Sequence, residues 1–181
     1  PSPTQTIIES NVMRGSFATA GIASIAGGAE HRIARNDIRG CRIAGVVVTA
    51  LSLDNAIFGN TLVSNTNAGI VVSGSGTAVT SNTTDGRGGL RIAIDVQGST
   101  MLVLGNVISN HAMDGVLVNG EGADANRIRE NFVRCVGTAV GIRVASGDRN
   151  VVTNNALSGG AAGVYIVGTA NSNRIVRNTI T

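Results

Sequence analysis

The chain of 181 residues is poor in aromatic side chains: it has three Phe, one Tyr and no Trp. Because 43% of its residues are apolar and only 2% are aromatic, a core has to be built from Val, Ile, Leu and Ala. Proline occurs only at Pro1 and Pro3, whereas glycine occurs 25 times. Many glycines without later proline favour tight turns between short strands whose backbone N–H groups are all needed for pairing.

Lysine is absent, so all 14 basic residues are arginine, and the net charge is +3. A protein that binds nucleic acid would be expected to gather its basic residues on one surface, together with stacking aromatic side chains. Here the arginines are spread along the sequence with acidic residues between them. The sequence therefore argues against nucleic acid as a partner.

Long apolar segments are also absent, and no stretch approaches the ~18 residues that a membrane-spanning helix needs. The first residues, PSPTQTIIES, lack the basic and apolar regions of a signal peptide. We expect the chain to be a single domain over residues 1–181, cut from a longer protein.

A repeat of about 24 residues fills the sequence, and a repeat of this length is typical of a solenoid. Its most constant position is an asparagine. The eight copies are Asn11, Asn36, Asn60, Asn82, Asn106, Asn131, Asn155 and Asn178. A bend between strands suits a residue that tolerates left-handed or bridge backbone geometry, and stacked asparagines can pass amide hydrogen bonds from one repeat to the next. We interpret this series as a structural ladder at a corner of the solenoid.

Apolar residues around each ladder asparagine alternate with polar ones, which indicates short strands with one buried face. A Gly-Φ-x-Φ segment (Φ, apolar) follows later in each repeat, for example Gly45–Val48 and Gly115–Val118. Since the same positions recur inward in every repeat, the coils must stack in register with parallel pairing. The sequence therefore predicts an all-β fold, a right-handed parallel β-helix of about seven coils.

A second, sparser asparagine series lies five residues before the ladder and gives the phrases NRIREN (126–131), NVVTNN (150–155) and NRIVRN (173–178). These phrases resemble the repeats of the right-handed parallel β-helix superfamily, which includes pectate lyases, polygalacturonases, mannuronan C5-epimerases, NosD-like periplasmic proteins and phage tailspikes. The resemblance covers the whole chain. It implies the fold, but not one function, because the same coil carries enzymes and inert stalks.

Catalytic motifs of that superfamily are incomplete here. His111 and Asp114 are the nearest match to the Asp-Pro-His-Glu motif of the epimerases, and Asp85 faintly echoes the paired aspartates of polygalacturonases. These three residues are weak catalytic candidates. Asp124 and Asp148, each seven residues before a ladder asparagine, are weak calcium candidates, because calcium needs six to eight oxygens. We predict no cofactor.

The two cysteines, Cys41 and Cys135, lie four coils apart. At a coil spacing of about 4.8 Å they are separated by roughly 19 Å, whereas a disulfide needs Cα atoms within ~7 Å. We expect two free thiols.

The fourth repeat breaks the pattern, because Thr84 takes an inward apolar position and residues 83–89 read TTDGRGG. A shifted bend is the expected cause, although such a break is also where function can lie.

An outward stripe runs along the Gly-Φ-x-Φ strands, and contiguous exposed apolar surface usually marks an interface. Tyr165 is the sole aromatic side chain that we expect to be exposed, and we favour a surface contact on a flat sheet over a sugar-binding platform as its role. The stripe reads Ala23, Val47, Val71, Arg91, Leu117, Arg143 and Tyr165.

From the residues and the resemblance together, we expect a non-catalytic, rigid β-helix scaffold of an extracellular or cell-surface protein, which associates with itself or with a neighbouring domain through Val47, Val71, Leu117, Arg143 and Tyr165. Two alternatives stay open. One is a polysaccharide-acting lyase, epimerase or hydrolase; the other is a segment of a phage-type fibre. Carboxylates gathered with Arg or His on one coil face would favour the enzyme.

Overall fold

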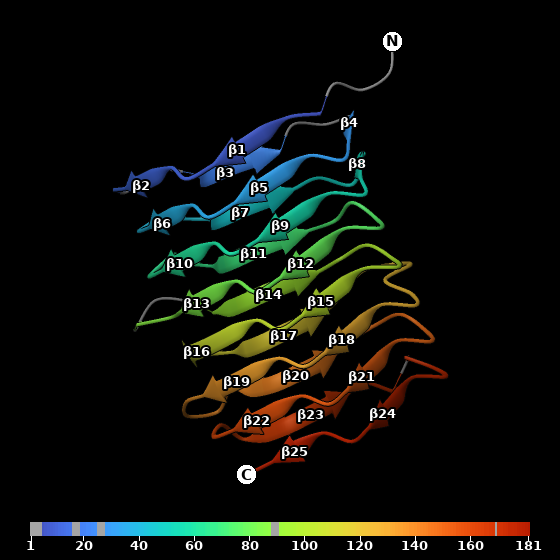
Figure 1. Cartoon of the computed structure of the whole chain (residues 1–181). Coiled ribbons are helices and arrows are strands. Elements are labelled where there is room, and N and C mark those ends of the chain that lie inside the picture. Colours follow the sequence, from blue (N-terminus) through green and yellow to red (C-terminus); the bar gives the residue numbers. More distant parts are fainter. Residues whose placement is uncertain (1–4, 16–18, 25–27, 88–90, 169) are drawn as a thin grey trace.

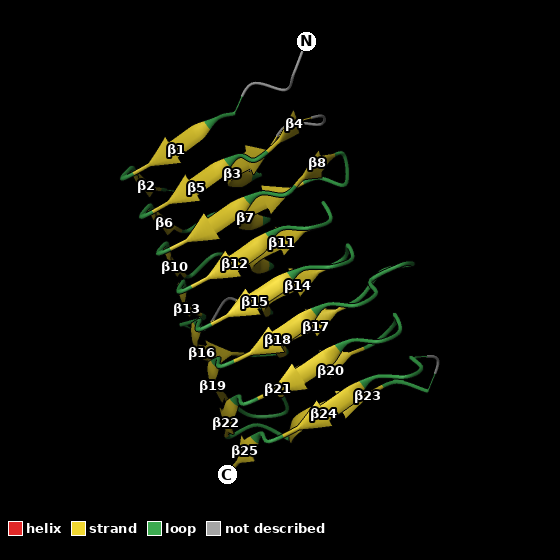
Figure 2. Ribbon diagram, turned by 45° about the vertical axis from the view of Figure 1, so that its right-hand side comes forward, coloured by secondary structure: helices red, strands yellow, loops and turns green. Residues whose placement is uncertain are grey.

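A computed structural model describes residues 5–15, 19–24, 28–87, 91–168 and 170–181. These residues form strands and connecting turns with no helix, stacked in about seven coils (Figures 1 and 2). All of the strand pairs are parallel, and each strand pairs with its counterparts in the neighbouring coils. The predicted parallel β-helix is confirmed.

Three sheets, which we call A, B and C, run the length of the solenoid. Sheet A consists of β1 (Ile7–Glu9), β5 (Arg32–Ala34), β9 (Ala56–Phe58), β12 (Ala78–Thr80), β15 (Leu102–Leu104), β18 (Arg127–Arg129), β21 (Val151–Thr153) and β24 (Arg174–Val176). Sheet B consists of β2 (Val12–Arg14), β6 (Asp37–Arg39), β10 (Thr61–Val63), β13 (Thr83–Asp85), β16 (Val107–His111), β19 (Phe132–Cys135), β22 (Ala156–Ser158) and β25 (Thr179–Ile180).

Sheet C consists of β3 (Ala20–Ser24), β7 (Ala44–Val48), β11 (Ala68–Val72), β14 (Ile92–Val96), β17 (Asp114–Val118), β20 (Val140–Val144) and β23 (Ala162–Ile166). The short strands β4 (Gly28–Ala29) and β8 (Ser52–Leu53) pair at the corner between sheets C and A.

The core is a column of β-branched and other aliphatic side chains that point inward from all three sheets. Each coil contributes the same positions, as the sequence pattern predicts; Ile57, Leu62 and Ile70, for example, come from one coil and are fully buried. Glycine is needed where sheet C meets this column. A Cβ at Gly45 would collide with the side chain of Leu62 and lie 2.8 Å from the carbonyl oxygen of Gly69.

The asparagine ladder forms the corner between sheets A and B. The amide oxygen of Asn60 accepts hydrogen bonds from both the backbone N–H and the side-chain amide of Asn36, each at 2.9 Å, and Asn60 binds Asn82 in the same way. The other amide N–H of Asn60 donates to the carbonyl oxygen of Ile33 at 2.9 Å. Each inner ladder side chain is therefore used by its neighbours.

Left-handed backbone geometry, one of the two geometries expected at the ladder asparagines, lies at the neighbouring residue instead. Positive φ is found at the residue before the ladder position, for example Arg35 (53°), Ser81 (54°) and Glu130 (57°), and not at the asparagine itself. The turn residue points to solvent, while the asparagine that follows turns inward to make the hydrogen bonds. The two requirements of the corner are thus divided between two adjacent residues.

Candidate functional site

The outer face of sheet C differs from the predicted stripe in the fourth coil. In that coil β14 pairs Ile92 with Ala68 and Asp95 with Val71, so Ala93 takes the position that glycine holds in the neighbouring coils. Asp95, and not Arg91, is therefore the outward residue between Val71 and Leu117. The expected strand start at Gly89 and Leu90 lies outside the described residues. The prediction that Arg91 belongs to the stripe was wrong.

Asp95 is a carboxylate on an outer face that is nevertheless only 9% exposed. Its Oδ2 accepts a 2.7 Å hydrogen bond from Nε2 of Gln97, whose Oε1 in turn accepts one from Ser73 at 2.7 Å. Its Oδ1 is buried and has no hydrogen-bond partner among the described residues. A buried carboxylate oxygen without a donor is costly, so this site disfavours the charged form of Asp95.

Asp114, at the start of β17, is 1% exposed and accepts a 3.0 Å hydrogen bond from Nε of Arg143. The guanidinium of Arg143 also lies over the ring of Tyr165, 5.6 Å from its centroid. Together with Gln97, these side chains form what we call the sheet C polar centre: Asp95, Gln97, Asp114 and Arg143.

Burial raises the pKa of both carboxyl groups in this centre. For Asp95, burial is the main cause, the hydrogen bond from Gln97 opposes it, and the negative charge of Asp114 adds to it. The pKa of Asp114 is also raised, because its burial outweighs the stabilising charge and hydrogen bond of Arg143. Both groups hold their protons to higher pH than a free aspartate, which is a property that acid–base catalysts share with some structural carboxyls.

The stripe residues proposed as an interface are unequally exposed. Val47, Val71 and Arg143 are half-buried and Tyr165 is 50% exposed, but Leu117 is only 9% exposed. With Asp95 between Val71 and Leu117, the apolar part of the stripe is divided into two segments.

The three catalytic candidates do not meet. His111 is fully buried with its Nε2 3.2 Å from Oγ1 of Thr84, and burial lowers its pKa to about 4. Asp85 instead contacts Arg87 at 2.7 Å and the side-chain amide of Asn110 at 2.9 Å. Asp114, the third candidate, belongs to the sheet C polar centre. The polar Thr84 at an inward position is explained by its contact with His111.

Asp124 and Asp148, the calcium candidates, lie in stacked turns and bind backbone. Oδ1 of Asp124 accepts a 2.7 Å hydrogen bond from the N–H of Asp148, whose Oδ1 accepts one from the N–H of Asn171 at 2.8 Å. Arg149 lies 3.5 Å from the other oxygen of Asp124. This arrangement extends a turn from coil to coil.

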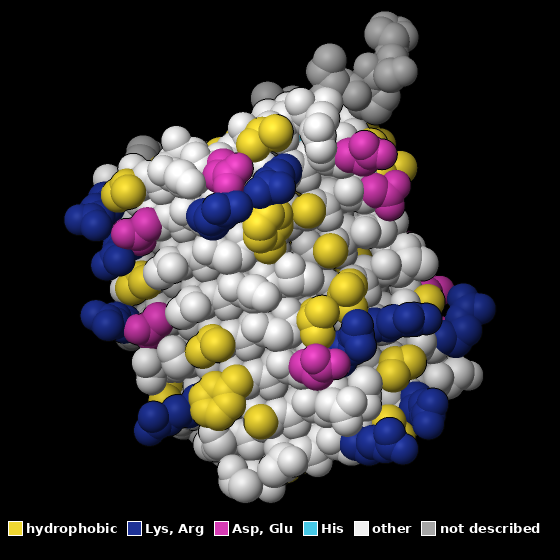
Figure 3. Space-filling model, in the orientation of Figure 1, with side chains coloured by type: hydrophobic (Ala, Val, Ile, Leu, Met, Phe, Trp, Pro, Cys, Tyr) yellow, Lys and Arg dark blue, Asp and Glu magenta, His cyan; other side chains and the backbone are white. Residues whose placement is uncertain are grey.

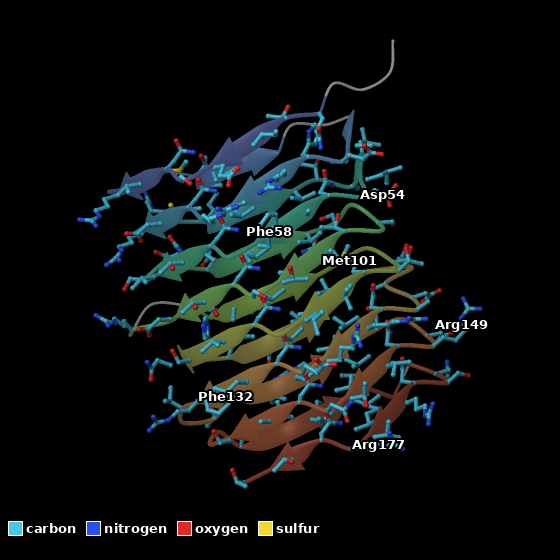
Figure 4. The ribbon with its side chains drawn as sticks, viewed as in Figure 1. Asp54, Phe58, Met101, Phe132, Arg149 and Arg177 are labelled. Carbon is cyan, nitrogen blue, oxygen red and sulfur yellow. The ribbon has the colours of Figure 1, made fainter. Side chains whose placement is uncertain are left out.

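Two features of the outer faces were missed from the sequence. Asp95 could have been found by counting one period of about 24 residues on from Val71, without relying on glycine as the marker. Phe132, on the outer face of sheet B, is 52% exposed beside Val107, so Tyr165 is not the sole exposed aromatic side chain (Figure 4). The alternation around the ladder could have shown this, because Phe132 directly precedes the inward Val133.

No helix in the described residues is long and apolar enough to cross a membrane. Comparison with known proteins gives one family match: residues 64–181, more than half of the chain, match the model of a family described as "Periplasmic copper-binding protein (NosD)". A search of curated proteins finds no match.

Proposed function

The chain belongs to the NosD family, and on that premise we propose that it is a non-catalytic periplasmic scaffold that contacts a second copy or a neighbouring domain through the outer face of sheet C. The observation that carries the proposal is the unbroken register of seven parallel strands in that sheet. Such pairing holds outward side chains at fixed positions on a rigid surface, as a contact surface requires.

The apolar contribution to this contact comes from Val47 and Val71 at one end and from Tyr165 at the other. Light scattering over a concentration series tests it with Val47→Glu/Val71→Glu, because both side chains are half-buried and point outward. Leu117 is unsuitable for the test, since a charge at a residue 9% exposed would also disturb folding. The matched control is Thr61→Glu/Val63→Glu, on β10 of sheet B.

We expect the wild-type mass to rise with concentration, the sheet C variant to stay monomeric and the sheet B control to behave as wild type. A wild-type protein that is monomeric throughout, or a sheet C variant with unchanged mass, would remove self-association from the proposal.

Copper, which the family description names, does not fit the described residues. Copper in proteins is held by Cys, Met and His ligands, and no three His, Cys, Asp or Glu side chains converge in the described part of the chain. His111 and Cys135 are neighbours across β16 and β19, but the thiol donates to the carbonyl oxygen of Val140, and burial raises its pKa to about 11. We therefore derive no chemistry through copper.

A second candidate is an enzyme that acts on polysaccharide, and the sheet C polar centre favours it. Asp95 and Asp114 keep their protons to raised pH, and Arg143 contacts Asp114, so one carboxyl group could protonate a leaving oxygen while the guanidinium binds an acidic sugar. Reducing-sugar and unsaturated-product assays on a panel of uronate polymers test this. Activity that Asp95→Asn and Asp114→Asn abolish would establish it, and no activity on any polymer would leave the scaffold proposal alone.

A further inference from the structure

The outer face of sheet A carries an excess of positive charge. Its outward positions include Arg32, Arg127, Arg129 and Arg174 but only one acidic residue, Glu9. Four arginines against one glutamate leave +3, which equals the net charge of the whole chain. The remainder of the protein is therefore balanced, although the arginines looked evenly spread in the sequence.

The positive charge is least compensated in the second half of this face. Glu9 is bound at the other end, 3.4 Å from Arg32 and 3.0 Å from Arg35. Among the described residues Arg127 and Arg174 have no acidic partner, while the contact of Arg129 with Glu130 is 3.4 Å long and solvent-exposed. Exposed pairs of this kind contribute little. These guanidinium groups are therefore available to an external anion.

Apolar side chains lie between the two groups of arginines. Phe58, Leu102 and Leu104 point outward from β9 and β15 and are half-buried. Figure 3 shows hydrophobic side chains in the middle of this face, with dark blue groups above and to the right, and Figure 4 places Phe58 near its centre. The face is thus amphipathic, with an apolar middle and basic ends.

A groove of about 400 Å³ opens where the apolar middle meets the basic end. One side of it is apolar and the other presents two guanidinium groups, which can each bind two oxygens of a phosphate. The groove is lined by Thr100, Met101, Leu102, Ala125, Arg127 and Arg129.

We propose that the outer face of sheet A docks on an anionic phospholipid membrane, with a headgroup phosphate in the groove beside Arg127 and Arg129. Peripheral binding of this kind combines attraction to anionic lipid with apolar side chains at the headgroup boundary, and this face offers both. Single-stranded nucleic acid would need aromatic platforms, whereas Phe58, the one aromatic ring among the outward positions of sheet A, is covered by Arg32 at 4.6 Å. A soluble acidic polymer would make no use of Leu102 and Leu104.

Vesicle co-sedimentation tests the proposal, with phosphatidylcholine vesicles compared with vesicles of equal parts phosphatidylcholine and phosphatidylglycerol. The test variant is Arg127→Gln/Arg129→Gln/Arg174→Gln. The matched control removes three arginines from the outer face of sheet B, Arg14→Gln/Arg39→Gln/Arg134→Gln, with the same change of net charge. Circular dichroism melting verifies that both variants fold.

We expect binding to the anionic vesicles only, weakened by added salt. Since each arginine near an anionic surface raises binding about fivefold, the sheet A variant should bind roughly a hundredfold more weakly, whereas the sheet B control should change much less. Equal losses in the two variants would mean attraction by net charge alone and would overturn the proposal. So would a failure to bind anionic vesicles, whether or not inorganic phosphate or a soluble uronate polymer binds instead.

Discussion

Asn106→Ala tests whether the asparagine ladder stabilises the fold in the way its hydrogen bonds indicate. The side-chain amide of Asn106 donates to the carbonyl oxygens of Val79 and Leu104 and to Oδ1 of Asn131, at 2.9, 3.3 and 2.9 Å. Its oxygen accepts from the backbone N–H and the side-chain amide of Asn82, at 2.9 and 3.1 Å. The residue is fully buried, so water cannot replace a lost partner without opening the corner.

The alanine variant leaves two buried donors of Asn82 without an acceptor. An unsatisfied buried donor costs about 1–3 kcal/mol, so we expect a loss of about 2–6 kcal/mol in the free energy of unfolding. For a domain whose whole stability is about 5–15 kcal/mol this is a large fraction. Urea titration followed by far-UV circular dichroism measures it as a lower midpoint with an unchanged slope.

Asn11→Ala is the matched control, because Asn11 begins the ladder and its side chain is exposed. Its amide donates to Oδ1 of Asn36 and to the carbonyl oxygen of Glu9, both at 3.0–3.1 Å, and no described residue donates to its own oxygen. We expect a loss below about 1 kcal/mol. If Asn106→Ala cost no more than Asn11→Ala, the ladder would be a consequence of the stacking rather than a cause of its stability.

Three further predictions concern single residues. Burial lowers the pKa of His111 from 6.5 to about 4, so between these pH values the unfolded chain binds a proton that the folded chain does not bind. Relative to His111→Gln, the wild type should therefore lose about 3 kcal/mol of unfolding free energy between about pH 6.5 and pH 4. Urea titrations of both proteins that show the same pH dependence would refute this. Burial raises the pKa of Asp95 because it disfavours the charged carboxylate. Asp95→Asn should therefore raise the urea midpoint at pH 7 and lose that gain near pH 3.8, where the wild-type carboxyl is protonated. A lower midpoint of the variant at pH 7 would contradict this. Ala125 has φ of 55°, a left-handed conformation that is strained for a residue with a Cβ. Ala125→Gly should therefore gain about 0.5–1 kcal/mol in the free energy of unfolding, whereas Ala156→Gly, in strand β22, should lose about as much. Thermal melts that show a loss of stability in both variants would rule out backbone strain at Ala125.

The fold could be predicted from the sequence because inward positions are constrained in every coil. Ile33, Ile57 and Val79 occupy one column, each paired with the next across sheet A. A mistake at one coil is corrected by the other six, so the period, the ladder and the parallel register all emerge from a single chain.

The register of sheet C was harder, because it was inferred from one marker. Glycine is required where a Cβ would strike the next coil, as at Gly69, whose Cβ would lie 2.6 Å from the carbonyl oxygen of Ala93. Ala93 itself departs from that rule, and a nearby Gly89 suggested an alignment several residues too early. The resulting error moved Arg91 into the stripe and left Asp95 out of it.

Outward positions carry no such redundancy, and this limits what a repeat reveals about function. The ladder continues without interruption from Asn60 through Asn82 to Asn106, although the fourth coil changes its inward Thr84 and its outward Asp95. Because the corner and the core hold the coil in place, a carboxylate can be placed on sheet C, or arginines on sheet A, at little risk to the fold. Asp95 occurs once and belongs to no periodic pattern. Arg32, Arg127 and Arg174 share one position of the repeat, but the coils between them carry other residues there. Asp95 becomes meaningful only when the register of sheet C brings it near Asp114, 19 residues away in the sequence, whose negative charge helps to raise its pKa.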